Sequence, residues 1–307
     1  MHKFIKKSII FFTPLAVWGI VILLIDPFNY FNIFNIIPKK LKIDNARSIN
    51  LLLYQSIEFN NSPNEYLIIG DSRTDILPRD KIELISGNYY GSLCNNAAKL
   101  NEIIDLVYMA NEINKLKQVG IGINFNMFNE YGYADRVSDI KNILSNPLKY
   151  IYGRNTLQAC YYILRSAFFE QDVISDPPMA KEQFWKWILE IKATHWYGRY
   201  KFPIKLLKDL KGLDTYCFEN DITLTFVIMP HNREFHDRLV EFGLEEDEQK
   251  FKSSMGKLKA TVVDYDYDND ITRFKRNFDD PIHYNSEIAN LIVNEIWGNN
   301  LIIGKKL

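Results

Sequence analysis

Short apolar runs that stop at small or polar residues recur along the chain, with helical spacing between them. The run Tyr66–Ile69 ends at Gly70, and within residues 96–116 apolar side chains recur every three or four positions. Short apolar runs bounded by turn residues are typical of buried strands, and their alternation with helices is typical of parallel sheets. The pattern predicts an α/β fold of three layers around a mostly parallel, doubly wound sheet. Its five expected strands are Tyr66–Ile69, Asn88–Leu93, Val119–Phe125, Ile222–Met229 and Thr261–Tyr265.

The first 27 residues follow a different pattern. Lys3, Lys6 and Lys7 precede an uncharged apolar run from Ser8 to Ile25. As a helix this run would be about 27 Å long, close to the thickness of a bilayer core. No Ala-x-Ala cleavage site follows it, so we expect an uncleaved signal anchor, with the lysines on the cytoplasmic side and the body of the protein outside. The alternative is the buried N-terminal helix of a soluble protein.

After this cytoplasmic tip and anchor (1–27), the pattern predicts a connector and one sheet domain. Residues 28–64 are mixed and polar, with one short helical stretch around 49–57. The sheet domain covers 65–300 and carries a helical insertion at about 130–212, where strand–helix alternation stops and aromatic residues are frequent. These aromatic residues could line a substrate site, as a lid or as part of its wall. They could instead form a small core of their own, which is the commoner arrangement. We expect a mixture of the two.

Composition and charge exclude several classes of protein. The 307-residue chain has 37 basic and 38 acidic residues, a net charge of −1, and no long basic run. Nucleic-acid binding requires clustered Lys and Arg, so nucleic acid is not the expected partner. Cys94, Cys160 and Cys217 are odd in number and form no CxxC pair, which predicts neither a zinc site nor a disulfide framework.

The strongest candidate for chemistry is Ser72, which follows the first strand after Gly70-Asp71. Open α/β sheets place their sites at the carboxyl ends of the strands, so Ser72 is expected at such an edge. A Ser hydroxyl is a poor nucleophile at neutral pH without an adjacent base. Asp71 could instead only hydrogen-bond within the loop that holds Ser72.

The loop after the last strand supplies a candidate base. It contains Asp280-Pro281-Ile282-His283, in which an Asp lies three residues before a His across a stiff Pro. Such a carboxylate can fold back onto the imidazole, fix its tautomer and raise the basicity of the other ring nitrogen. The alternative for a single His is a local hydrogen bond within the loop.

These residues resemble the SGNH (GDSL-like) hydrolases. Gly70-Asp71-Ser72, Gly122-Ile123-Asn124 and Asp280-x-x-His283 are similar to blocks I, III and V of that family, over about residues 66–126 and 222–297. The resemblance implies a flavodoxin-like fold in which Ser72 is the nucleophile, His283 the general base and Asp280 its orienting partner. It implies no metal and no cofactor for the reaction.

The family's oxyanion hole consists of the Ser backbone N–H, a block II Gly and the block III Asn. The resemblance therefore implies donors from the Ser72 N–H and the Asn124 side-chain amide. The chain departs from the family at block II, where Asn95 aligns with the Gly and could still donate through its backbone N–H, with Gly91 as the competing candidate.

Two further polar residues could contact a substrate. Arg73 could bind an anionic group, although a surface ion pair is the alternative. His231 follows the strand 222–229 and could line the pocket, although it could simply begin the next helix.

Together these features predict a membrane-anchored esterase or O-acyltransferase, with its catalytic domain in the periplasm or outside the cell and its anchor in the bacterial inner membrane. The expected partner is an acylated envelope glycan or lipid-linked sugar, with acetyl as a candidate acyl group and other envelope-modification proteins as possible partners. Anchored relatives that it resembles include the alginate acetylation proteins and the D-alanylation protein of teichoic acids. The alternative is an inactive protein of the same fold that binds glycans or assists envelope assembly, which the block II departure and the aromatic insertion favour.

Overall fold

The structure is a computed structural model that describes residues 2–34, 36–169 and 179–307. Residues 170–178, which fall inside the expected insertion, lie outside the described part. The chain forms two compact units: an N-terminal unit of Met1–Ser62 with Ser138–Asp176, and a sheet unit of Pro63–Val137 with Pro177–Leu307.

The sheet unit is built on a six-stranded sheet in the order β2-β1-β3-β4-β5-β8. All neighbouring strands are parallel except β5 and β8, which pair antiparallel. The strands are β1 (Tyr66–Gly70), β2 (Gly91–Cys94), β3 (Gln118–Ile123), β4 (Thr223–Ile228), β5 (Thr261–Asp264) and β8 (Lys305–Lys306). The prediction of a mostly parallel doubly wound sheet is therefore confirmed, while the count of five strands is wrong. The sixth strand is only two residues long, too short to leave a periodic pattern.

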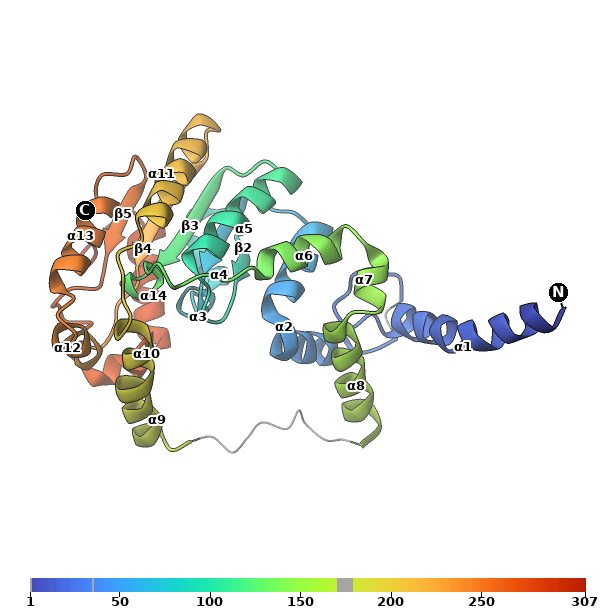
Figure 1. The fold of residues 1–307 in the computed structure, drawn as a ribbon. Helices are drawn as coiled ribbons and strands as arrows, with labels where there is room; N and C mark the ends of the chain where they lie inside the picture. Colours follow the sequence, from blue (N-terminus) through green and yellow to red (C-terminus); the bar gives the residue numbers. More distant parts are fainter. Residues whose placement is uncertain (1, 35, 170–178) are drawn as a thin grey trace. The chain divides into compact units, whose positions relative to one another are not determined.

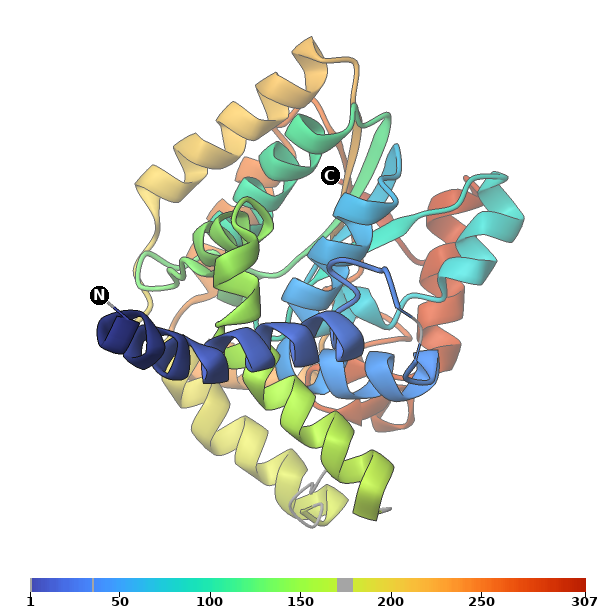
Figure 2. The ribbon, with the colours of Figure 1, turned by 90° about the vertical axis from the view of Figure 1, so that its right-hand side faces the viewer.

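Helices cover both faces of this sheet (Figures 1 and 2). On one face α5 (Leu100–Ile113) lies beside α11 (Ile204–Glu219), and on the other α4 (Arg79–Ser86) lies beside α14 (Ser286–Trp297). Alternate residues of a strand point to opposite faces of the sheet, so each buried strand contributes side chains to the hydrophobic cores on both faces. Sheet residues such as Ile68 and Val227 pack with Ile292 of α14 in one buried cluster.

Two glycines make room for the turn that follows β1. A Cβ on Gly70 or on Gly122 would lie 2.1 Å or 1.9 Å from the Thr74 hydroxyl oxygen, far inside van der Waals contact. Only the absence of both side chains allows α3 (Ser72–Asp75) to lie directly on the carboxyl ends of β1 and β3. The glycines inside the expected strands are therefore what positions Ser72 against the sheet.

The remaining elements of the sheet unit follow the strands or fill the insertion. They are η1 (Phe125–Met127), α9 (Lys181–Trp187), the π-helical turn η2 (Ile188–Lys192), α10 (Ala193–Tyr197), α12 (Arg233–Glu241), α13 (Glu245–Met255), η3 (Lys275–Asn277), β6 (Phe278–Asp280) and β7 (His283–Tyr284). Strands β6 and β7 form a separate antiparallel pair. The carboxyl ends of β1, β3, β4 and β5 meet at one edge, as parallel strands require.

The N-terminal unit contains α1 (His2–Ile25), α2 (Lys39–Asn61), α7 (Pro147–Ile151), α8 (Arg154–Phe169) and most of α6 (Arg136–Leu144). Helix α1 ends on the buried Asp26, whose carboxylate accepts hydrogen bonds from the backbone N–H groups of Tyr30, Phe31 and Asn32 at 2.8–2.9 Å. The Tyr150 hydroxyl donates to the same carboxylate at 2.7 Å. This network fixes the chain where the apolar helix stops.

Residues 4–25 form one helix that is long and apolar enough to cross a membrane, with a mean hydropathy of 2.5. The short helix expected around 49–57 is part of the longer α2, which is a correction. Non-helical backbone at Asn50 (φ −153°, ψ 90°) divides α2 in two, and the Asn50 side chain accepts a hydrogen bond from the Leu53 N–H at 2.9 Å. The first half of α2 is too polar to show an apolar stripe, so only the second half was predicted.

Candidate active site

Asp71 shapes the turn that presents Ser72. It is the N-cap of α3, with one carboxylate oxygen accepting from the Arg73 N–H at 3.0 Å, and its carbonyl accepts from the N–H groups of Thr74 and Asp75 at 3.0 Å and 3.1 Å. An Asp at an N-cap satisfies backbone donors that the first helical turn leaves open. Among the described residues, the Ser72 N–H forms no hydrogen bond to a protein acceptor.

The β6–β7 hairpin brings Asp280 and His283 together. The two residues are register partners across a two-residue turn that contains Pro281. One Asp280 oxygen accepts from the backbone N–H groups of Ile282 and His283 at 2.9 Å and 3.0 Å. The other lies 2.6 Å from His283 Nδ1. The aspartate is therefore held by three donors from its own hairpin.

His283 also reaches Ser72, which is 211 positions away in the sequence. Its Nε2 lies 2.8 Å from the Ser72 Oγ. The Asp280 side chain is 10 % exposed and the His283 side chain 27 % exposed, so the imidazole borders solvent while its carboxylate partner does not. An acceptor nitrogen at this distance from a hydroxyl can take its proton, and the carboxylate at Nδ1 stabilises the imidazolium that results.

The Asp280 carboxyl stays ionised in this setting. Burial raises its pKa, but the hydrogen bonds from His283 and from the Ile282 and His283 backbone outweigh that effect and hold the pKa below its ordinary value. The negative charge opposite Nδ1 is thus present throughout the neutral range.

Tyr284 links the hairpin to the turn that carries Ser72, and no motif in the sequence singled it out. Its hydroxyl donates to the Arg73 carbonyl at 2.5 Å, and the side chain is fully buried. Burial raises the pKa of this phenol well above its ordinary range, so it remains a donor. The residue after His283 and the residue after Ser72 are therefore joined by a direct hydrogen bond.

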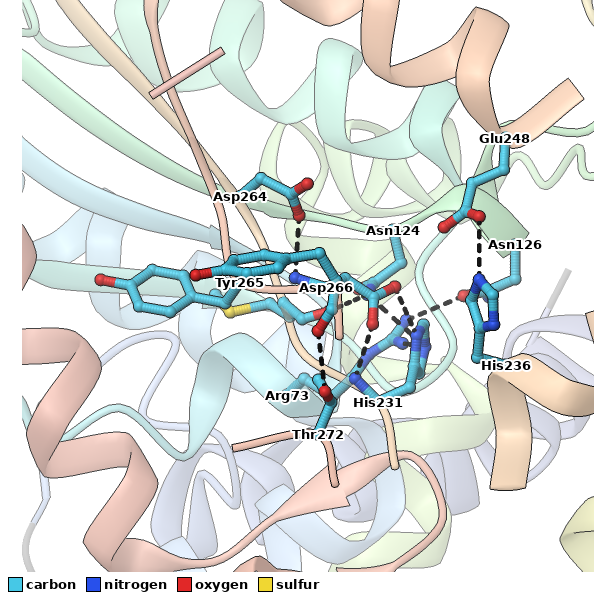
Figure 3. Close-up of polar contacts among 12 residues, drawn as sticks. Arg73, Asn124, Asn126, His231, His236, Glu248, Asp264, Tyr265, Asp266 and Thr272 are labelled. Atoms are coloured by element: carbon cyan, nitrogen blue, oxygen red, sulfur yellow. Dashed lines mark hydrogen bonds and ion pairs between the residues drawn. The ribbon is translucent and has the colours of Figure 1, made fainter. Parts of the chain in front are cut away.

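Arg73 lies in the protein interior, 1 % exposed, so the surface ion pair expected for it is wrong. Its Nε and Nη2 donate to one Asp71 oxygen at 2.9 Å and 2.6 Å, and its Nη1 lies 2.5 Å from His231 Nε2 (Figure 3). Its Nη2 also donates to the Asn126 side-chain oxygen at 3.3 Å. Because these contacts occupy its donors, the guanidinium stabilises the turn that carries Ser72 and is not available to bind an anionic substrate.

His231 belongs to the same network and is 4 % exposed. Its Nδ1 lies 2.8 Å from one Asp266 oxygen, and its backbone N–H donates to the other at 2.9 Å (Figure 3). Because a guanidinium only donates, His231 Nε2 accepts from Arg73 and the proton is on Nδ1, facing Asp266. His231 is therefore buried with both ring nitrogens in contact with partners, and it also borders a small cavity together with Asp266 and His236. Asn232 caps the helix that follows.

The sequence offered one usable signal for this second His–Asp pair. His231 follows β4 and Asp266 follows β5, so both come directly after neighbouring parallel strands. Two such residues must meet at the carboxyl edge.

Asp266 is strongly stabilised as a carboxylate. Burial raises its pKa, but the electrostatic interaction and hydrogen bonds with His231, together with the charge of the nearby Lys252 ammonium, outweigh that effect, so that the pKa lies well below its ordinary value. A carboxyl whose pKa is lower in the folded than in the unfolded chain adds stability above pH 4 to 5, and this stability is lost as the pH falls.

We therefore expect Asp266→Asn to lower the free energy of unfolding at pH 7 by about 2 kcal/mol, because charge-assisted hydrogen bonds are lost. The deficit relative to the unmodified chain should shrink at pH 3.5. Urea unfolding of the full chain in detergent at both pH values measures it. A loss of stability of the same size at pH 7 and at pH 3.5 would contradict the conclusion that Asp266 is held as a carboxylate in the folded chain.

The candidate oxyanion donors Asn124, Asn95 and Gly91 differ in their hydrogen-bond partners and in their positions along the strands. The Asn124 side chain is fully buried, and its Nδ2 donates to the Met229 carbonyl at 2.7 Å and faces His231 Nε2 at 3.5 Å. The Asn95 N–H donates to the Gly70 carbonyl at 3.0 Å, so it is not free to bind an oxyanion, which corrects that expectation. Gly91 begins β2 opposite Leu67, at the amino ends of the strands and away from Ser72, so the competing candidate is wrong as well.

No three His, Cys, Asp or Glu side chains within the described ranges are grouped as metal ligands would be. Cys94, Cys160 and Cys217 are buried.

No protein-family model and no curated protein matches this sequence. Among solved structures, it is similar to a G-D-S-L family lipolytic protein from Desulfitobacterium hafniense, at 12% identity and a TM-score of 0.39, over 76% of this chain and 99% of the other. It is also similar to a GDSL-like lipase from Bacteroides thetaiotaomicron, at 8% identity and a TM-score of 0.40, over 81% and 98% of the two chains.

Proposed function

We propose that this protein is an SGNH-type serine esterase or O-acyltransferase, with Ser72 as nucleophile, His283 as general base and Asp280 as the group that orients it. The observation that carries the proposal is the continuous set of contacts from Ser72 Oγ through the imidazole to the Asp280 carboxylate, at 2.8 Å and 2.6 Å. The three groups come from two elements that Tyr284 ties together, which favours a maintained geometry.

In the proposed reaction, Ser72 Oγ attacks the carbonyl carbon of an ester while its proton moves to His283 Nε2. The tetrahedral intermediate collapses as the C–O bond to the alcohol breaks and His283 returns the proton to the leaving oxygen. The resulting acyl-enzyme is then attacked by water or by a second hydroxyl, whose proton passes to Nε2 and finally to Ser72. Water as the attacking group gives hydrolysis, and a sugar hydroxyl gives transfer.

The oxyanion of the intermediate needs donors already in place. We assign one of them to the Ser72 backbone N–H, which the Asp71 cap leaves without a protein acceptor. A single donor of this type typically contributes about 3 kcal/mol to transition-state stabilisation.

We propose further that α1 anchors the catalytic unit to the bacterial inner membrane and that the ester belongs to an envelope glycan or lipid-linked sugar. The support is the apolar helix over residues 4–25, most of which is not buried in the structure, with Lys3, Lys6 and Lys7 at its N-terminal end, where they favour a cytoplasmic N-terminus. A C-terminal alkaline phosphatase fusion tests the orientation, since it should be active only if the catalytic unit lies outside the cytoplasm.

Covalent labelling tests the chemistry before any substrate is known. The full chain in detergent is expected to react with a fluorophosphonate at Ser72, because the probe requires an activated serine and an oxyanion site. Peptide mass mapping locates the adduct. Ser72→Ala should abolish labelling, and Ser86→Ala, at the last residue of α4, should leave it unchanged. A folded chain that takes up no probe would instead support the binding-protein alternative.

A further inference from the structure

Only part of the apolar helix α1 is free of contacts with the rest of the N-terminal unit. From Ser8 to Val17 the helix is uncharged and its side chains are almost all exposed, whereas Ile22 and Ile25 near its end are buried. At about 1.5 Å per residue the free stretch is about 15 Å long, half of a hydrocarbon core of about 30 Å. Tilting only lengthens the path through the bilayer. If α1 crosses a membrane, its last two turns must therefore lie in the bilayer as well.

The corner between α7 and α8, residues 147–154, lies against this part of α1 (Figure 1). The Ile151 carbonyl accepts a hydrogen bond from the Trp18 indole N–H at 3.0 Å. The Tyr152 hydroxyl donates to the Leu15 carbonyl at 3.3 Å. Measured along the helix from its C-terminal end, the first contact lies at about 10 Å and the second at about 15 Å. The corner is therefore attached to α1 at levels that lie inside the bilayer when α1 spans it.

A buried network fixes the corner to the end of α1. The Tyr150 hydroxyl donates to the Asp26 carboxylate at 2.7 Å and accepts from the Phe28 N–H at 3.2 Å. The Tyr150 ring also stacks on that of Tyr30, with the ring centres 4.4 Å apart. Buried polar groups are costly to leave without partners, so the corner cannot separate from α1 without loss of stability. Its level along α1 is thereby set.

Two large side chains of the corner lie on the side of the bilayer. Tyr152 extends toward the middle of α1, where its hydroxyl meets the Leu15 carbonyl. Leu148 comes four residues earlier, on the same face of the helical turn, and is 62 % exposed. In water this leucine exposes apolar area at a cost in free energy, which contact with lipid removes. Tyrosine and tryptophan are also the residues enriched at membrane interfaces, which fits Tyr152 and Trp18.

The backbone of the corner is paired within the protein. The Tyr152 N–H donates to the Leu148 carbonyl at 3.0 Å. The Gly153 N–H donates to the Tyr150 carbonyl at 3.2 Å. The Ile151 carbonyl has the indole N–H as its donor. Hydrocarbon offers no hydrogen-bond partners, so a turn at this depth requires backbone groups that are paired in this way.

We propose that the α7–α8 corner is a second membrane contact of this chain, inserted beside α1 into the leaflet from which the C-terminal end of α1 emerges. Leu148 and Tyr152 lie among the acyl chains. Lys149 and Arg154, both exposed in the same corner, extend their charged ends to the lipid phosphates, as long cationic side chains do near membrane surfaces. The inference rests on the proposed anchoring by α1, and the partner is the lipid bilayer itself.

The test measures membrane depth at single sites of the full chain in phosphatidylcholine liposomes. The variants Leu148→Cys and Lys149→Cys each carry the fluorophore NBD on the new thiol. Leu15→Cys reports on α1 itself. Leu84→Cys is the matched control, because this leucine is 83 % exposed on α4 of the sheet unit. Lipids with a spin label in the headgroup, high in the acyl chain or near its end quench NBD at their own depth.

A label high in the acyl chain should lower NBD fluorescence at position 148 about two-fold or more and leave position 84 unchanged. The headgroup label should quench position 149, and the label near the chain end should quench position 15. Cys160 is buried on α8, so NBD on this native thiol, located by peptide mass mapping, would show that a variant is unfolded. The two corner positions are independent reporters, so either one suffices.

The site at position 15 separates this inference from the anchoring proposal. If position 15 is not quenched, α1 is not inserted and both fail. If position 15 is quenched while positions 148 and 149 behave like position 84, the anchor stands and the inference is wrong. NBD at position 148 that is blue-shifted but not quenched would mean that protein, such as a second copy of the chain, covers the corner, and this would also overturn it. So would equal quenching at positions 84 and 148, because lipid contact would then not be specific to the corner.

Discussion

Replacing His283 with Ala should lower kcat for hydrolysis of a short-chain aryl acetate by about 10⁴-fold or more, with little change in KM. Among the described residues, no other histidine is in contact with Ser72, and His231, which contacts the neighbouring Arg73, has its Nε2 directed at that guanidinium. Ser72→Ala should be as severe. The double variant should lose no more than either single one, because the two groups act as a unit.

Asp280→Asn provides the graded control for this prediction. An amide can still accept from the Ile282 and His283 N–H groups, so the hairpin should hold, but it cannot stabilise the imidazolium. Its kcat should fall by a smaller factor than that of His283→Ala. Near-ultraviolet circular dichroism checks that all the variants are folded. Activity that survives in both Ser72→Ala and His283→Ala would place the chemistry elsewhere.

Much of the sheet could be predicted because its strands are buried on both faces. Such strands appear as continuous apolar runs, and β1, β3, β4 and β5 all lie within or close to the expected ranges. Strand β8 was missed because two exposed lysines that pair through their backbone leave no apolar signal. The polar first half of α2 was missed for the same reason, since most of its stability comes from tertiary contacts that no periodicity records.

The site was predictable where its chemistry lies close in sequence or at strand ends. Asp280 and His283 are three residues apart, and Ser72 follows the first buried strand, so a short motif and the sheet topology suffice to bring them together. The support for the Ser72 turn was not predictable. Arg73 looked like a surface residue because a charged side chain is seldom buried without partners, and its partner His231 is 158 positions away in the sequence.

Changing Arg73 to Met tests that support and should cost about 3 to 5 kcal/mol in the free energy of unfolding. Met replaces the aliphatic stem of the arginine but not its guanidinium. It leaves the buried Asp71 charge without its ion pair, at 2.6 Å in the present structure, and leaves His231 Nε2 without its donor. Breaking one partner of a buried pair is costly because the other charge stays buried and uncompensated. Urea unfolding of the full chain in detergent measures the loss.

The matched control is Arg273→Met, which removes an arginine whose ion pair with Asp268 lies at the surface. Water can replace the lost partner there, so its unfolding curve should stay close to that of the unmodified chain. Arg73→Lys keeps the charge but not the planar fork that holds Asp71 and His231 at once, so it should recover only part of the stability. If Arg73→Met were as stable as the Arg273 control, the guanidinium would not be what holds the Asp71 cap. The position of Ser72 would then have to depend on Tyr284 and on the packing of Thr74 against the two glycines.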